Sequence, residues 1–148
     1  EAAFVAESGG ATQLDVTPTF NEELVVIAPA GHPKIRRARD LRSDTVVAFP
    51  GGCAYRRRLQ AWFAIDDRMP ERVMELSSYH AIVACVASGS GVALVPRSVL
   101  ATVRCADNIS VHSLGRKADR ITTCLVNRKG EASLALNALK FELARLKK

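Results

Sequence analysis

Two predicted helix starts in this chain could bind an anion through backbone amides. The first is the run Gly-Gly-Cys-Ala-Tyr at residues 51–55, where a predicted strand ends and a predicted helix begins. Amides in the first turn of a helix have no acceptor one turn earlier, and the helix dipole is positive at that end. The second is Ser77-Ser78, where Ser77 is the expected N-cap and Ser78 the better candidate for a ligand contact.

A third candidate is the turn at Gly91-Val92, where the glycine could leave room for a ligand. Arg56 could hold a carboxylate through a bidentate contact, but it also fits an exposed run of arginines at 56–58, which we favour. A purely structural interpretation stays open for each candidate. The glycines would then only turn the chain, Tyr55 and Val92 would belong to the core, and a serine would only cap a helix.

Cys53 could support a different chemistry, because a thiol at a helix N-terminus ionises more readily and reacts faster. His80 or His112 could activate it as a nucleophile if either residue lay nearby. No sequence signature of a cysteine hydrolase surrounds Cys53, so we prefer a thiol that senses oxidants to a catalytic one. We expect that the chain is not an enzyme.

The composition is that of an ordinary soluble globular protein. The chain has 148 residues, 48% of them hydrophobic, and a formal net charge of +6. It has no apolar run of the roughly 20 residues that a membrane-spanning helix needs, so no membrane partner is expected. Wide gaps separate the cysteines, which argues against a zinc site and a dense disulfide framework and favours reduced thiols in a cytoplasmic protein. These cysteines are Cys53, Cys85, Cys105 and Cys124. No cofactor is expected.

Strands and helices alternate along the chain, which predicts an α/β sheet with right-handed crossovers. Apolar, β-branched runs predict the strands, and a 3.6-residue period of apolar side chains predicts the helices. In the last helix, Ala132, Leu136, Leu139, Leu143 and Leu146 share one stripe. The predicted strands are 2–6, 23–28, 45–49, 72–76, 92–95, 109–114 and 120–127, and the predicted helices are 39–41, 53–65, 77–88, 97–102 and 132–147.

The order of these segments resembles the effector-binding domain of LysR-type transcriptional regulators. AAFV at residues 2–5 looks like the family strand "D-[LI]-A-[LI]", and VVAFPGGCAYR at 46–56 is similar to the segment that carries Gly-Cys-x-Tyr-Arg. Three more segments correspond to family patterns in the same order. They are EELVVIAPAGHP at 22–33, SGSGVALVPRS at 88–98 and TCLVNRKG at 123–130.

The resemblance implies a two-lobed fold like that of periplasmic binding proteins. Lobe I would be incomplete, with residues 1–29 and 121–148, and lobe II would be complete, with residues 30–120. We expect the chain to be a fragment of a longer protein whose N-terminal winged helix-turn-helix reads DNA. A small effector, with a carboxylate as the expected group, would bind between the lobes. The effector residues would be Gly52, Cys53, Ala54, Tyr55, Ser77, Ser78, Gly91 and Val92.

Three hypotheses about function follow. The leading one is the ligand-sensing domain of a cytoplasmic LysR-type regulator that forms a homodimer or tetramer. The second is a solute-binding protein for transport, because the bilobed fold is shared. The third is a redox sensor built on Cys53.

Overall fold

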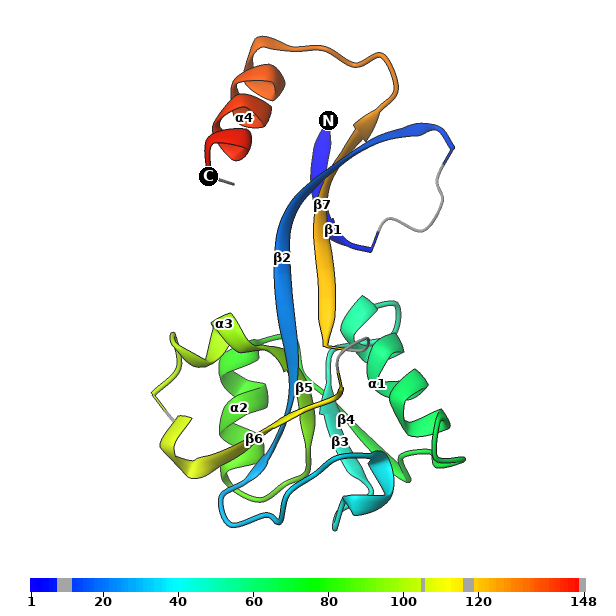
Figure 1. Ribbon diagram of the computed structural model, residues 1–148, viewed down its shortest axis with the longest axis vertical. Helices are drawn as coiled ribbons and strands as arrows, with labels where there is room; N and C mark the ends of the chain where they lie inside the picture. Colours follow the sequence, from blue (N-terminus) through cyan, green and yellow to red (C-terminus); the bar gives the residue numbers. More distant parts are fainter. Residues whose placement is uncertain (8–11, 105, 116–118, 147–148) are drawn as a thin grey trace. The chain divides into compact units, whose positions relative to one another are not determined.

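The computed structural model describes residues 1–7, 12–104, 106–115 and 119–146 of the chain (Figure 1). Every predicted strand and helix is found there, with shifts at the ends of the elements. In chain order the elements are β1 (Ala2–Ala6), β2 (Leu14–Pro29), a 3₁₀ turn (Ala38–Asp40), β3 (Thr45–Ala48), α1 (Ala54–Ala64), β4 (Arg72–Glu75), α2 (Tyr79–Ala87), β5 (Ala93–Pro96), α3 (Arg97–Leu100), a second 3₁₀ turn (Ala106–Asn108), β6 (Ile109–Ser113), β7 (Arg120–Arg128) and α4 (Leu134–Arg145).

The chain forms two compact units. Unit 1 comprises Glu1–Glu22 and Ile121–Lys148, and unit 2 comprises Glu23–Arg120. Strand β2 contributes residues to both units, since the boundary falls between Glu22 and Glu23. Each unit has its own cluster of buried apolar side chains, so each is described separately.

Unit 1 is built from β1, β7, the first part of β2 and helix α4. Strand β1 pairs with β7 in antiparallel register, with Ala2 opposite Asn127, and β2 lies on the other side of β7. The hydroxyl of Thr19 on β2 donates a 2.6 Å hydrogen bond to the carbonyl of Thr123 on β7. The buried apolar cluster of this unit consists of Leu125, Leu136 and Leu143, which places one side of α4 against the sheet.

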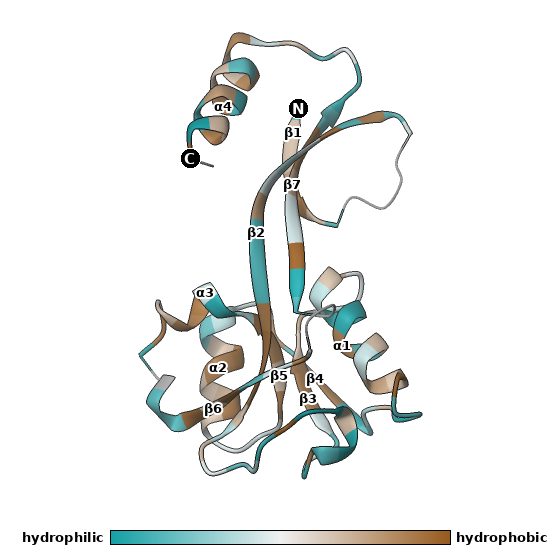
Figure 2. Ribbon diagram, in the orientation of Figure 1, coloured by the Kyte–Doolittle hydropathy of each residue, from teal (hydrophilic) through white to brown (hydrophobic). Residues whose placement is uncertain are grey.

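Unit 2 contains the main hydrophobic core. The second part of β2 runs antiparallel to β5 on one side and to β6 on the other, and Leu24 through Ala28 are fully buried. Strands β3 and β4 form a parallel pair, and a parallel bridge joins Val46 of β3 to Val92 next to β5. Figure 2 shows hydrophobic residues concentrated along the second part of β2 and along β3, β5 and α2, where the core cluster lies.

Two predictions about elements were wrong in extent. Strand β2 begins at Leu14, nine residues before the predicted start of 23. The missed part is rich in polar residues and contains Pro18, and it becomes a strand because it lies beside β7. The apolar stripe of the last helix was also overestimated. Leu136 and Leu143 are buried there, whereas Leu139 and Leu146 are exposed and Ala132 precedes the helix.

Candidate functional site

Strands β3 and β4 end at the same edge of their parallel pair, and each is followed directly by a helix. Ala48 lies opposite Glu75 in the register, and the Leu76 amide donates a 2.9 Å hydrogen bond to the Ala48 carbonyl. The chain then enters α1 after β3 and α2 after β4. Ligands of open α/β sheets bind outside the carboxyl ends of the strands, where helices begin. This edge of unit 2 is therefore the candidate site.

Aromatic contacts bring the two helix starts together. The rings of Phe49, at the end of β3, and Tyr79, the first residue of α2, meet edge to face with centroids 4.8 Å apart. The ring of Tyr55, in the first turn of α1, lies 6.4 Å from the ring of Tyr79. The sequence predicted both helix starts, and the structure places them side by side. Tyr55 is half-buried in this aromatic group.

The start of α1 has neither a capping side-chain hydrogen bond nor an acidic residue in its first turn. Cys53 is the N-cap, but its side chain makes no capping hydrogen bond, and the first turn of the helix contains no acidic residue. Gly52 is exposed and has a φ of +91°, a conformation that favours glycine. The guanidinium of Arg57 donates a 2.8 Å hydrogen bond to the Gly52 carbonyl, so a cation is fixed beside this turn.

The start of α2 also lacks a capping side-chain bond and an acidic residue in its first turn. The predicted N-cap was wrong by one residue. Ser78, not Ser77, is the N-cap, and its side chain makes no capping hydrogen bond. Both serines are exposed, and within the described residues neither hydroxyl bonds to another protein group. Two exposed hydroxyls therefore lie beside a helix start that has no acidic residue in its first turn.

Arg56 does not belong to a solvated arginine run, so that interpretation was wrong. Its side chain is only 18% exposed and forms an ion pair with Glu75 at the end of β4. It also donates a 3.4 Å hydrogen bond to the Phe49 carbonyl. Arg56 thus ties the first turn of α1 to the ends of β3 and β4. Sequence reasoning missed Glu75, because its role depends on which strands are neighbours. It also missed Arg57, whose bond to the Gly52 carbonyl is local but depends on the direction of one side chain.

Three of the predicted effector residues lie in the interior. Ala54 is 8% exposed, Val92 is fully buried and Gly91 is buried. A Cβ atom at Gly91 would lie 2.4 Å from the carbonyl oxygen of Thr45, so the missing side chain allows close strand packing and does not leave room for a ligand. The Val92 amide and carbonyl bond to Thr45 and Val47 at 3.0 and 2.8 Å. These three residues are therefore packed in the interior of unit 2.

Among the described residues, no histidine is hydrogen-bonded to the Cys53 thiol. His112, on β6, bonds through its ring to the amide of Ile35 and to the hydroxyl of Ser110, and His80 is an exposed residue of α2. No hydrogen bond joins either ring to Cys53 among these residues, and no group of three or more potential metal ligands occurs in the same part of the chain. Cys105 lies outside the described residues.

In the described parts of the chain, no helix is both long and apolar enough to cross a membrane. Comparison with known proteins relates the whole chain to one family. Residues 1–146 match the family model described as "LysR substrate binding domain". Among curated proteins, the HTH-type transcriptional regulator GltR of Bacillus subtilis is 32% identical over 110 residues, which cover 74% of this chain and 37% of that protein. The chain spans less than half the length of the curated relatives it matches.

Solved structures agree in fold. The regulatory domain of CcmR from Synechocystis PCC6803, solved in complex with 2-PG, aligns with a TM-score of 0.82 and 21% identity over 99% of this chain and 73% of that one. The effector-binding domain of QuiR in complex with shikimate aligns with a TM-score of 0.78 and 20% identity over 98% of this chain and 70% of that one. By its match over nearly the whole length, this α/β chain belongs to the LysR substrate-binding domain family.

Proposed function

We propose that the chain is the ligand-sensing part of a LysR-type transcriptional regulator that binds DNA through a separate N-terminal domain. Its family supports this role over transport, and so do its curated relatives, which are named as HTH-type transcriptional regulators. The whole protein would act in the cytoplasm as a homodimer or tetramer and would sense a ligand without transforming it. No cofactor is part of this proposal.

The effector site we propose is the edge of unit 2 where α1 and α2 begin. The observation that carries it is the pairing of two helix starts at the carboxyl ends of parallel strands, both without a capping side-chain bond or an acidic residue in the first turn. Gly52, Cys53, Tyr55, Ser77 and Ser78 would contact the ligand. Ala54, Gly91 and Val92 would form the packed layer behind it.

A small carboxylate is the ligand that this chemistry fits best. Backbone amides at helix N-termini favour negative charge, and the serine hydroxyls add donors that can turn toward a carboxylate oxygen. Arg57 adds a positive charge close to Gly52. Shikimate, the ligand named for QuiR, carries a carboxylate. The effector would change promoter binding only if it bound one arrangement of the oligomer more tightly than another.

Calorimetry tests the site with shikimate and benzoate as the first probes, followed by other small carboxylates. Ser78→Ala should weaken the binding of a responding carboxylate about tenfold, since a hydrogen bond to a charged group contributes about 1.5–3 kcal/mol. Ser98→Ala is the matched control, because Ser98 is an exposed serine on α3. Equal affinities of both variants and the parent for every binding carboxylate would rule out the site. Promoter binding by the full-length protein that no carboxylate alters would contradict the function.

A further inference from the structure

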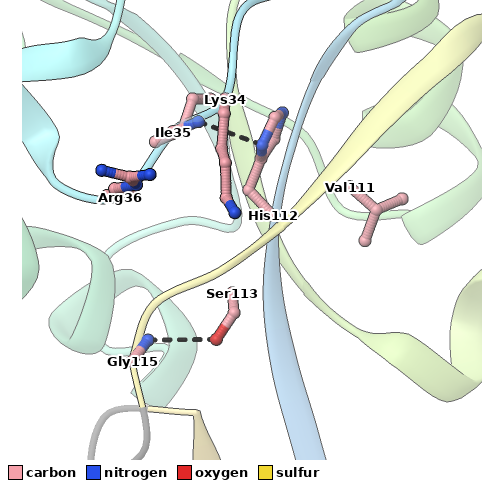
Figure 3. Close-up of a pocket in the computed structure, with 7 residues that line it drawn as sticks. All are labelled: Lys34, Ile35, Arg36, Val111, His112, Ser113 and Gly115. Carbon is pink, nitrogen blue, oxygen red and sulfur yellow. Dashed lines mark hydrogen bonds between the residues drawn. The ribbon is translucent and has the colours of Figure 1, made fainter.

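A second pocket lies in unit 2, between the segment that follows β2 and strand β6. Its volume is about 640 Å³, within the range of pockets that hold small organic ligands. Lys34 and Arg36 line it from one side, and His112, Ser113 and Gly115 line it from the other (Figure 3). None of these residues belongs to the helix starts of α1 and α2, so the pocket is distinct from the proposed effector site.

Positive charge dominates the pocket. Lys34 and Arg36 are exposed, and no lining residue is acidic. Over the described parts of the chain, neither cationic side chain has an ion-pair partner. The nearest carboxylate on the same segment, Asp40, already accepts the amides of Arg36 and Arg37 at 2.8 and 3.1 Å. The two side-chain cations therefore remain available to a ligand.

The segment that carries these cations is fixed to β6. Ile35, between them, is 2% exposed, and its amide donates a 3.1 Å hydrogen bond to Nδ1 of His112. The other ring nitrogen of His112 lies 2.9 Å from the Ser110 hydroxyl, which itself donates to the Pro29 carbonyl at 3.1 Å. His112 is thus held as a neutral ring with its proton on Nε2. Because the backbone of this segment is already fixed, ligand binding needs to order only the two side chains.

Hydrogen bonds also fix the far wall of the pocket, which Ser113 and Gly115 form. The Ser113 hydroxyl accepts a 3.2 Å hydrogen bond from the Gly115 amide and donates to the Asp119 carboxylate. Figure 3 shows the Lys34 side chain extending from its segment toward β6, with Arg36 beside it and Ser113 and Gly115 across the opening. A ligand in this opening would meet cationic groups on one side and, on the other, the polar Ser113 and Gly115, with the Asp119 carboxylate already accepting the Ser113 hydroxyl.

We propose that this pocket binds a small organic oxyanion, a carboxylate or a phosphate, through the ammonium of Lys34 and the guanidinium of Arg36. Charge-assisted hydrogen bonds from a lysine and an arginine suit either group, since arginine binds two oxygens at once and lysine acts as a point charge. The site would be independent of the effector site, because it uses different elements of unit 2.

Residue-resolved NMR tests this proposal. The chain is titrated separately with inorganic phosphate and with malonate at constant pH and ionic strength, and the amide of Ile35 and the ring of His112 are followed. Saturable shifts at both positions are expected from at least one probe, and the probe that saturates identifies the oxyanion. Lys34→Gln and Arg36→Gln should each weaken that binding about tenfold, while Lys34→Arg should largely retain it.

Two controls separate this site from general charge screening and from the proposed effector site. Arg104→Gln removes an exposed arginine of unit 2 outside the pocket lining and should leave the affinity unchanged. Ser78→Ala should leave the shifts at Ile35 and His112 unchanged, whatever it does to carboxylate sensing. Shifts that fail to saturate with both probes, or affinities equal in Lys34→Gln and the parent, would overturn the proposal.

Discussion

Gly91→Ala should destabilise unit 2 although it adds only a methyl group. The new Cβ would lie 2.4 Å from the Thr45 carbonyl oxygen and 3.0 Å from its carbonyl carbon. Both atoms belong to the backbone of β3, so no side-chain rotation can relieve the contact. The strand must instead move away from the segment that contains Val92, to which it is joined by a parallel bridge.

The cost follows from the contacts that would be disturbed. Overpacking a tightly packed interior costs about 1–3 kcal/mol. The displacement would also stretch the hydrogen bonds from the Val92 amide to Thr45 and from the Val47 amide to Val92, now 3.0 and 2.8 Å. A backbone hydrogen bond contributes about 1 kcal/mol net, so the free energy of unfolding of unit 2 should fall by about 2–4 kcal/mol.

Urea denaturation followed by the fluorescence of Trp62 measures this change. Trp62 is the only tryptophan of the chain and is 4% exposed in unit 2. Gly51→Ala is the matched control, because a Cβ there meets no atom within 4 Å and Gly51 does not have a positive φ. It should change the free energy of unfolding by less than about 0.5 kcal/mol. A Gly91→Ala variant as stable as Gly51→Ala would refute the packing argument.

Three further results are expected. Burial, and next the charge of His32, hold the pKa of His112 below its ordinary value, so the unfolded chain binds this proton more tightly than the folded one. The urea midpoint of unit 2 should therefore fall as the pH drops below about 6.5, and His112→Asn should flatten this dependence. Ser133→Ala should cost unit 1 about 1 kcal/mol, measured by amide exchange of α4, because its side chain accepts the Leu136 amide at 3.1 Å. Equal exchange in the variant and the parent would refute that capping role. Leu59→Ala, at a site 2% exposed, should destabilise unit 2 by about 2–5 kcal/mol in urea, whereas Leu134→Ala, at a site 91% exposed, should have little effect.

The sequence predicted elements well wherever burial alone selects the residue types. The buried run Val25–Val26–Ile27 reads as a strand without knowledge of its neighbours, since both its faces are covered. The region from Leu14 to Glu22 reads as a loop because its strand conformation depends on pairing with β7, more than a hundred residues away in the chain. Pairing between distant segments leaves no local periodicity to detect.

In the candidate site, too, the sequence predicted what local rules decide and missed what depends on contacts between distant segments. Glycines and serines at helix starts follow from local rules, so 51–55 and 77–78 could be identified from spacing. The Arg56–Glu75 ion pair could not, because it requires β3 and β4 to be adjacent and parallel. Gly91 was misassigned for a related reason. A glycine that permits close packing and one that admits a ligand look alike until the opposing atom is known.

Strand β4 has a consequence for the solubility of this protein. Among the described strands it pairs only with β3, and all its residues are exposed, including Val73 and Met74. An exposed apolar strand edge is a template for aggregation through added strands. Arg72 and Glu75 place a charge at each end of this four-residue strand, which opposes stacking of identical copies in parallel register. Neutralising both charges would therefore make the protein more prone to aggregate without removing any contact of its hydrophobic core.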